Sequence, residues 1–375
     1  DFKEEEKMAR TLKSTPKQDG FRMPGEFEEH ERSWLIWPER TDTWRDGAKP
    51  AQKVFVDVAT KLVKYEPLTV LVSAAQYENA RARLPEEVRV IEMSTDDAWT
   101  QDKGPSFVIN DKGEVRGVHW GWNAYGGLEG GLYFPWRLDQ QVGQKILEIE
   151  DCDRYDATHF VLENGATQVD GEGTLIVTEQ VFMNHNRNGN MTKEETEKNL
   201  KEYMNIDKVI WLKKGMAFDE TDGHVDDVCF FARPGVVVLS WVDDPNHPQY
   251  ECLKEAYDIL SQETDAKGRK LEIIKIHIPE VLYITEEEND GIDICQDAAP
   301  RDPGLPLAVT YINSYLINGA VLVPQFGDPR DKEAMEKMQE IYPDRDIVPI
   351  YTREWSLAGG NVHCMTLQQP KAQFK

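Results

Sequence analysis

The stretch Leu357-Ala358-Gly359-Gly360-Asn361-Val362-His363-Cys364 lies near the C-terminus and joins a pair of glycines to several polar residues. A similar pattern, Leu162-Glu163-Asn164-Gly165-Ala166-Thr167-Gln168, occurs much earlier in the chain. A third polar turn, Asp222-Gly223-His224-Val225-Asp226-Asp227, comes directly before an apolar run. These similarities predict internal repetition, and repeated units that carry polar groups at one end would converge on a central site.

Strand and helix signals alternate outward from these turns to both ends of the chain. Short runs with β-forming residues predict strands at 33–37, 68–72, 88–92, 106–109, 174–178, 208–211, 236–241, 272–276, 320–324 and 347–351. Helical periodicity predicts helices at 50–65, 75–84, 140–148, 192–204, 251–263 and 331–341. No linker-like stretch interrupts them, so we predict an α/β fold with a single domain over residues 8–375. Residues 1–7 are mostly charged and precede Met8, which predicts an expression-tag remnant.

The composition favours a soluble, cytoplasmic protein that binds neither nucleic acid nor a membrane. The chain has 43 Lys and Arg against 68 Asp and Glu, a formal net charge of −25, and no basic run suited to phosphates. This charge suits a small cationic substrate, although an acidic surface also serves solubility alone. No apolar run approaches the roughly 20 residues of a membrane span.

The cysteines point to one candidate nucleophile. They number five and have no CxxC spacing, which argues against a disulfide framework and a zinc cluster. We therefore expect free thiols, most of them buried fillers. Cys364 differs because it follows a glycine pair and has polar neighbours, a setting that allows a close backbone approach to a ligand.

His224 and Asp226 are candidates for proton transfer and cation binding. If their segment is a strand, both side chains point to the same face and share one pocket. An Asp-rich surface turn is the alternative interpretation. The other histidines stand alone in the sequence, and His363 is expected to face away from Cys364 if that segment is extended.

Asp102 and Glu163 are further acidic candidates, although a lone acid beside a strand is often only a solvated cap. Together with Asp226 they suit a guanidinium ion, whose N–H donors match carboxylates bidentately. Such acids would hold the guanidinium carbon before the thiol of Cys364, and His224 could move protons without a metal or cofactor. Nearby acids raise a thiol pKa, so protonated His224 or the arriving cation must favour the thiolate.

At this point the sequence resembles the agmatine deiminases of the guanidine-modifying, or pentein, superfamily, from about Gly20 to Pro370. The resemblance is carried in one order by Phe21-Arg22-Met23-Pro24-Gly25-Glu26-Phe27, Trp37-Pro38-Glu39-Arg40, Trp44-Arg45, Asn123-Ala124-Tyr125-Gly126-Gly127, Val169-Asp170-Gly171-Glu172-Gly173-Thr174, Gly223-His224-Val225-Asp226-Asp227, Pro324-Gln325-Phe326-Gly327-Asp328 and Gly359-Gly360-Asn361-Val362-His363-Cys364. It implies a β/α propeller with pseudo-fivefold repeats around a central active site. It also implies hydrolysis of agmatine to N-carbamoylputrescine and ammonia, a step toward putrescine.

The resemblance also implies roles for individual residues. The implied set is Cys364 as nucleophile, His224 as general acid and base, Glu163 as support for His224 and the substrate nitrogens, Asp102 and Asp226 as guanidinium holders, and Trp99 and Glu220 near the substrate. Glu220 would help to place the distal ammonium group. Family members are commonly homo-oligomers, so a homodimer or larger assembly is expected.

The chain departs from the family pattern at several positions. The family usually has Arg at position 101, Cys, Ser or Thr at 103, Gly at 164 and His at 168, where this chain has Gln101, Lys103, Asn164 and Gln168. Asp222 and Leu367 also replace the usual Asn and Gln. Since Cys364, His224, Glu163, Asp102 and Asp226 are all present, we expect the chemistry to be retained. The departures are expected to alter the rate, the pKa values or the substrate preference.

Three alternatives remain at this point. A deiminase of free or peptidyl arginine would share the chemistry, but it should place a cation for an α-carboxylate or open a cleft for a polypeptide. A homologue that binds agmatine or polyamines without turnover is a second alternative. A cysteine protease would explain Cys364 and His224 but not the acids.

Overall fold

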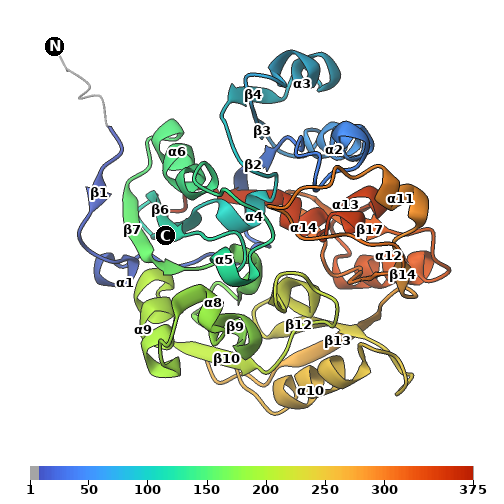
Figure 1. Cartoon of the computed structure of the whole chain (residues 1–375). Helices are drawn as coiled ribbons and strands as arrows, with labels where there is room; N and C mark the ends of the chain where they lie inside the picture. The colour runs from blue at the N-terminus through green and yellow to red at the C-terminus, as the bar shows by residue number, and fades with distance from the viewer. Residues whose placement is uncertain (1–7, 375) are drawn as a thin grey trace.

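The computed structural model describes residues 8–374, in which strands and helices alternate as the sequence predicts (Figure 1). Residues 1–7, interpreted above as a tag remnant, lie outside the described residues. Every predicted strand and helix overlaps an observed one. In the helix α2 (Lys49–Leu62), for example, Phe55, Val58, Ala59 and Leu62 form one buried face at the predicted spacing.

Five of the sheets in residues 8–374 share one topology: a first strand pairs antiparallel with a middle strand, which pairs parallel with a third. We name each unit after its middle strand. The β2 unit has β19 (Thr366–Pro370), β2 (His30–Ile36) and β3 (Leu68–Val72); the β6 unit has β5 (Ser106–Ile109), β6 (Val115–Gly121) and β7 (Arg154–Val161); the β9 unit has β8 (Gln168–Val169), β9 (Thr174–Thr178) and β10 (Lys208–Leu212); the β12 unit has β11 (Cys229–Arg233), β12 (Val236–Trp241) and β13 (Glu272–His277); the β17 unit has β16 (Tyr315–Ile317), β17 (Ala320–Gln325) and β18 (Asp346–Tyr351).

Helices connect the middle strand of each unit to its parallel neighbour, as parallel pairing requires. These crossovers contain α2, α5 (Gly127–Gly130), α6 (Val142–Ile149), α7 to α9 (Glu179–Phe182, His185–Asn188 and Lys193–Met204), α10 (Tyr250–Leu260) and α12 (Asp331–Ile341). The other strands and α-helices are β1 (Thr11–Leu12), β4 (Arg89–Glu92), β14 (Leu282–Tyr283), β15 (Pro306–Leu307), α1 (Pro16–Asp19), α3 (Tyr77–Arg83), α4 (Thr100–Lys103), α11 (Glu286–Asp290), α13 (Arg353–Leu357) and α14 (Val362–Met365).

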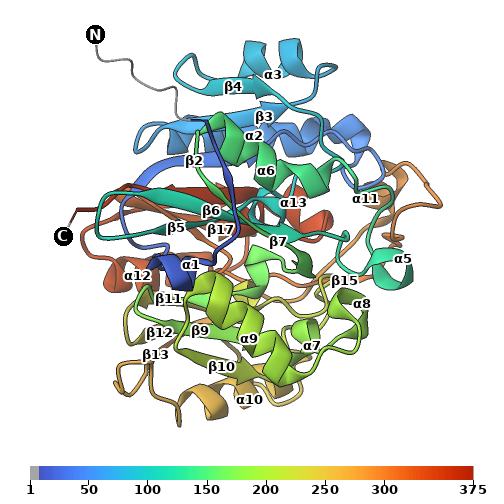
Figure 2. The same ribbon diagram turned by 90° about the vertical axis from the view of Figure 1, so that its left-hand side faces the viewer.

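The units follow one another around the molecule in chain order (Figure 1). Figure 2 shows the β6 unit between the β2 and β9 units. The C-terminal strand β19 pairs with β2, with Leu367 opposite Trp34, so the last strand of the chain completes the first unit, whereas β1 pairs with β7 in the β6 unit. The predicted α/β class and internal repetition are therefore confirmed, and the repeats place the segment before each first strand in an equivalent position.

Candidate active site

Polar residues lie directly before the first strand in all five units. The residues in these segments are Asp102 in α4 before β5, Glu163 and Asn164 before β8, His224 and Asp226 before β11, Asn313 before β16, and His363 and Cys364 in α14 before β19. Because the units share one topology, their equivalent segments meet at one place. Repetition thus gathers residues that are far apart in the sequence.

Gly165 marks the point where three predicted site residues converge. A Cβ atom built on Gly165 would lie 2.7 Å from Asp102 Oδ1, 2.8 Å from His224 Nδ1 and 2.9 Å from Asp226 Oδ2. The Gly165 backbone N–H donates to Asp102 Oδ1 at 3.0 Å, and His224 Nδ1 lies 3.7 Å from the same oxygen. The close approach requires glycine at this position and brings Asp102, His224 and Asp226 into one buried cluster.

The segment that contains His224 and Asp226 is not a strand, because Val225–Asp227 forms a 3-10 turn before β11. The backbone N–H of His224 donates to Asp219 Oδ2 at 2.8 Å, so a side chain takes a donor that a strand ladder would need. The turn still places both side chains at Gly165. The prediction of a shared pocket therefore agrees with the structure, although its geometric reason does not.

The nucleophile candidate Cys364 lies in the same cluster. Its Sγ atom is 3.8 Å from Asp226 Oδ2 and 3.3 Å from Asn313 Nδ2, which donates toward the sulfur. The Asn313 side chain also accepts hydrogen bonds from the backbone N–H groups of His363 and Cys364 at 3.0 and 3.4 Å. The sequence analysis missed Asn313. Its one signal in the sequence is that it lies before an apolar run, as the polar turns at 162–168, 222–227 and 357–364 also do.

His363 does not stand alone in the structure, and its segment is not extended, so the condition for its expected orientation away from Cys364 is not met. Residues Val362–Met365 form a helical turn, since Asn313 captures two backbone N–H groups there. His363 Nδ1 lies 2.8 Å from Asp226 Oδ2, and Nε2 lies 2.8 Å from Glu26 Oε2. Burial alone would lower the pKa of His363, but Glu26 and Asp226 raise it well above its usual value. His363 is thus a protonated partner of Asp226.

Glu163 is held by a buried ion pair that the sequence does not reveal. Arg187 Nε lies 2.6 Å from Glu163 Oε1, and both side chains are almost fully buried. Arg187 also pairs with Asp222 at 2.8 Å and donates to the Thr221 carbonyl at 2.8 Å. Asp222, one of the departures from the family pattern, is therefore a second carboxylate partner of Arg187.

Replacing Arg187 with Met is expected to destabilise the protein by about 3–5 kcal/mol, because it leaves Glu163 buried without its cation. Urea unfolding followed by circular dichroism measures this change. The Lys332→Met variant is the control, since its ion pair with Glu336 is exposed and should alter stability by less than about 0.5 kcal/mol. Equal stability of the Arg187 variant and the unaltered chain would contradict the assignment of Arg187 as the counter-ion of Glu163.

The acids determine the resting charges of the cluster. Burial raises the pKa of the Cys364 thiol well above its usual value, and Asp226, Asp227 and Asp102 raise it further. Burial also raises the pKa of Asp102 to about 6, although His224 opposes the shift. Burial lowers the pKa of His224, but Asp102 and Asp226 outweigh burial and raise it. The resting site thus favours a neutral thiol beside a protonated imidazole.

Two buried polar atoms in the cluster lack a hydrogen-bond partner within the described residues. His224 Nε2 and Asp226 Oδ1 have no hydrogen-bond partner among residues 8–374. Leaving such groups unpaired in a buried site is costly, which points to a ligand with hydrogen-bonding groups. A guanidinium ion could donate to Asp226 Oδ1 while its nitrogen lies near His224.

Trp99 and Glu220 lie against the glycine pair that precedes Cys364. A Cβ atom on Gly360 would meet the Trp99 ring, and one on Gly359 would meet the Glu220 carboxylate. The Trp99 indole donates to Asp97 Oδ2 at 3.0 Å, which fixes the ring. Both predicted substrate-binding residues therefore lie beside the turn that carries Cys364.

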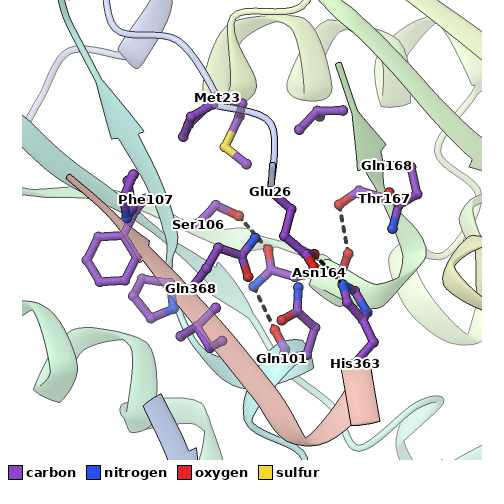
Figure 3. Close-up of a pocket in the computed structure, with 15 residues that line it drawn as sticks. Met23, Glu26, Gln101, Ser106, Phe107, Asn164, Thr167, Gln168, His363 and Gln368 are labelled. Atoms are coloured by element: carbon purple, nitrogen blue, oxygen red, sulfur yellow. Dashed lines mark hydrogen bonds and ion pairs between the residues drawn. The ribbon is translucent and has the colours of Figure 1, made fainter. Parts of the chain in front are cut away.

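Several residues that depart from the family pattern lie next to the acid cluster. Lys103 is buried, pairs with Asp139 at 2.5 Å and donates to the Asp97 carbonyl at 2.7 Å, so it supports the residue that holds Trp99. Gln101, Asn164 and Gln168 line a cavity of about 40 Å³ (Figure 3). Gln101 and Asn164 are chain neighbours of Asp102 and Glu163, so this cavity adjoins the acid cluster.

Comparison with known proteins places these residues in a family. Residues 22–370 match the family described as Porphyromonas-type peptidyl-arginine deiminase. The agmatine deiminase of Pseudomonas aeruginosa is 53% identical over 358 residues, which cover 95% of this chain and 97% of that protein. The agmatine deiminase of Pseudomonas fluorescens is 51% identical over 97% of this chain and 99% of its own. A solved structure of the Enterococcus faecalis agmatine deiminase has a TM-score of 0.94 at 48% identity, covering 97% of this chain and 99% of that chain.

Proposed function

Because this chain belongs to the Porphyromonas-type peptidyl-arginine deiminase family, we propose that it hydrolyses agmatine to N-carbamoylputrescine and ammonia. This reaction would be a step toward putrescine. The relatives named agmatine deiminase, similar over nearly their full lengths, support this substrate. The single observation that carries the chemistry is the convergence of Asp102, His224, Asp226 and Cys364.

Substrate binding follows from the geometry of the acids. The guanidinium group would donate to Asp102 and to the unpartnered Oδ1 atom of Asp226. Its cation would offset the buried negative charge of both residues. Held in this way, the guanidinium carbon would lie in front of the Cys364 sulfur, so that binding energy supplies the orientation for attack.

The reaction would then proceed in two steps. The Cys364 sulfur bonds to the guanidinium carbon, and protonated His224 gives a proton to the leaving nitrogen as the C–N bond breaks and ammonia departs. This leaves a thiouronium-type intermediate on the enzyme. Neutral His224 next takes a proton from water, the oxygen bonds to the same carbon, the C–S bond breaks, and the thiol is restored with the carbamoyl product.

Arrival of the substrate cation is the event that would favour the thiolate. In the resting site Cys364 contacts Asn313 and Asp226, and burial together with the acids keeps its pKa high. A guanidinium ion between Asp102 and Asp226 cancels those charges, while the Asn313 amide continues to donate to the sulfur. The thiol would therefore ionise, releasing its proton to bulk water, only when the substrate is in place, and the resulting thiolate is the form of Cys364 that bonds to the guanidinium carbon.

The kcat/KM value for agmatine is expected to fall as the pH drops below about 6. Asp102 has a pKa of about 6, so it is ionised above that pH and protonated below it. The protonated form cannot pair with the guanidinium, so kcat/KM should fall by up to tenfold per pH unit below 6. Initial rates between pH 5 and 8 measure this profile, and a flat profile over that range would contradict the role of Asp102.

Agmatine and arginine differ by an α-carboxylate, and Glu220 places negative charge beside the glycine pair where a substrate tail would pass. This favours agmatine over arginine. The decisive experiment is ammonia release from each substrate by the purified protein. Faster release from agmatine supports the proposal; faster release from arginine would replace agmatine with arginine, and tight agmatine binding without ammonia would support the non-catalytic alternative.

We also propose that the protein is cytoplasmic and forms a homodimer or a larger homo-oligomer. Within residues 8–374, the helices are all too short or too polar to span a bilayer. Light scattering coupled to size-exclusion chromatography tests the assembly, and a mass of one chain would contradict it.

A further inference from the structure

Tyr125 contacts the acid cluster from a part of the chain outside the five convergent segments. It lies between β6 and α5, and its hydroxyl donates to Asp102 Oδ2 at 2.6 Å. Both side chains are buried. The other oxygen, Oδ1, accepts the Gly165 N–H at 3.0 Å and lies 3.7 Å from His224 Nδ1. Each oxygen of Asp102 thus has its own partner, and the Tyr125 hydroxyl keeps Oδ1 directed toward His224.

The backbone that carries Tyr125 is strained. Ala124 and Tyr125 have φ values of 52° and 69°, in the left-handed region that glycine adopts freely and other residues rarely adopt. The Gly127 N–H closes this turn by donating to the Asn123 carbonyl at 2.7 Å. Strain of this kind persists only where the surrounding structure holds it, and it is concentrated at functional sites. Here the strained residue carries a side chain that ends at Asp102.

We propose that Tyr125 is a positioning residue for the reaction, because its hydroxyl holds Asp102 in the charged form that pairs with the substrate guanidinium. This inference rests on the proposed deiminase function and adds a residue to it. A hydrogen bond to an ionised acceptor is roughly twice as strong as one to a neutral acceptor, so the hydroxyl stabilises the charged form of Asp102 over the protonated form.

Other groups around Asp102 act on its charge in both directions. Burial is the main reason why the pKa of Asp102 is raised to about 6; His224 opposes this shift, whereas Asp226 and Glu163 add to it. The Cys364 thiol also faces this carboxylate, but it is neutral in the resting site. Two groups, the imidazole of His224 and the phenol of Tyr125, therefore counteract burial and the neighbouring acids.

The phenol of Tyr125 is suited to this role because it remains a donor. Burial and the charge of Asp102 raise the pKa of Tyr125 well above its usual value, so the hydroxyl stays protonated throughout the pH range of an assay. The Tyr125 ring also packs against the His224 ring, with 5.9 Å between the ring centroids. Phenylalanine at position 125 would keep this packing and remove only the hydroxyl, so the other charges around Asp102 would stay in place.

The test is the pH dependence of kcat/KM for agmatine in the unaltered protein and in Tyr125→Phe. Loss of one hydrogen bond to a charged group should move the midpoint of the profile upward by about 1 pH unit, from about 6 to about 7. The ratio of kcat/KM at pH 8 to kcat/KM at pH 6 should therefore rise from about 2 to about 10. A purely structural defect would lower both values equally and leave this ratio near 2.

Tyr133→Phe is the matched control. Tyr133 is also buried, and its hydroxyl donates to a different buried acid, Asp139, at 2.5 Å. This substitution should leave the ratio near 2, and circular dichroism establishes that both variants are folded. A ratio near 2 in Tyr125→Phe, or an equal rise in Tyr133→Phe, would overturn the inference.

If the unaltered protein does not turn over agmatine, the proposed function fails, and urea unfolding tests the Tyr125–Asp102 pair alone. An acid with a raised pKa in the folded state loses stability as the pH rises, and Tyr125→Phe should raise this pKa further. The substitution should therefore destabilise the protein more at pH 8 than at pH 4. In an Asp102→Asn background, it should destabilise the protein equally at both pH values. Equal destabilisation at both pH values with Asp102 present would overturn the inference.

Discussion

Purified Cys364→Ser protein is expected to release ammonia from agmatine at least about a thousandfold more slowly than the unaltered chain. A serine hydroxyl has nearly the same size as the thiol, so Asn313 and the acids can keep their positions. It is a far weaker acid, however, and the surrounding carboxylates that already raise the pKa of Cys364 would oppose an alkoxide even more strongly. The loss should therefore lie in kcat, with agmatine binding retained.

A matched control separates loss of the nucleophile from loss of a thiol. Cys252 is also buried and free, but it lies in α10 and packs with the apolar residues of the β12 unit. Cys252→Ser should keep nearly full turnover. Ammonia assays and calorimetric titration with agmatine measure rate and binding. Turnover by Cys364→Ser within tenfold of the unaltered rate would exclude Cys364 as the nucleophile.

The sequence predicts most of the regular structure because that structure depends on local pattern. The apolar run at 236–241 is buried along its whole length as β12, and the helical spacing at 50–65 produces the buried face of α2. Four of the five convergent segments were also identified from the sequence, since each combines a turn with polar residues before a strand-forming run. Local pattern alone thus located Asp102, Glu163, His224 and Cys364.

The partners of these residues could not be predicted in the same way, because they come from distant parts of the chain. Asn313 contacts Cys364 across 51 residues, and Glu26 contacts His363 across 337. These contacts exist only when the units close into one circle. They also decide local structure, since Asn313 accepts the backbone N–H groups of His363 and Cys364, whose segment is a helical turn. The roles of the individual site residues remain proposals that the substitutions above test.

Replacing Asp102 with Asn is expected to reduce agmatine turnover at least about a thousandfold while making the protein more stable at pH 8. Burial raises the pKa of Asp102 from 3.8 to about 6, so the folded protein disfavours the ionised form that the substrate needs. Keeping this carboxylate charged at pH 8 costs roughly 3 kcal/mol. Asparagine has a similar shape and no charge, and it can still accept the Gly165 hydrogen bond.

The sign of this stability difference depends on pH. An acid whose pKa is higher in the folded state binds its proton more tightly there, so its contribution to stability is present below about pH 4 and is lost as the pH rises through 6. The Asn variant lacks this loss. Its advantage in urea unfolding should therefore be about 1–3 kcal/mol at pH 8, after some loss from the Tyr125 hydrogen bond, and should shrink toward zero near pH 4.

Asp139→Asn is the contrasting control, since this buried acid is paired with buried Lys103 and its loss leaves the lysine uncompensated. That variant should be less stable at pH 8 by about 3–5 kcal/mol. Opposite signs of the stability change at pH 8 for these two buried Asp→Asn substitutions would show that the charged Asp102 side chain lowers stability and is retained for substrate binding. A loss of stability in Asp102→Asn at pH 8 would instead mean that its hydrogen bonds outweigh its charge, and Asp102 would then be a structural residue.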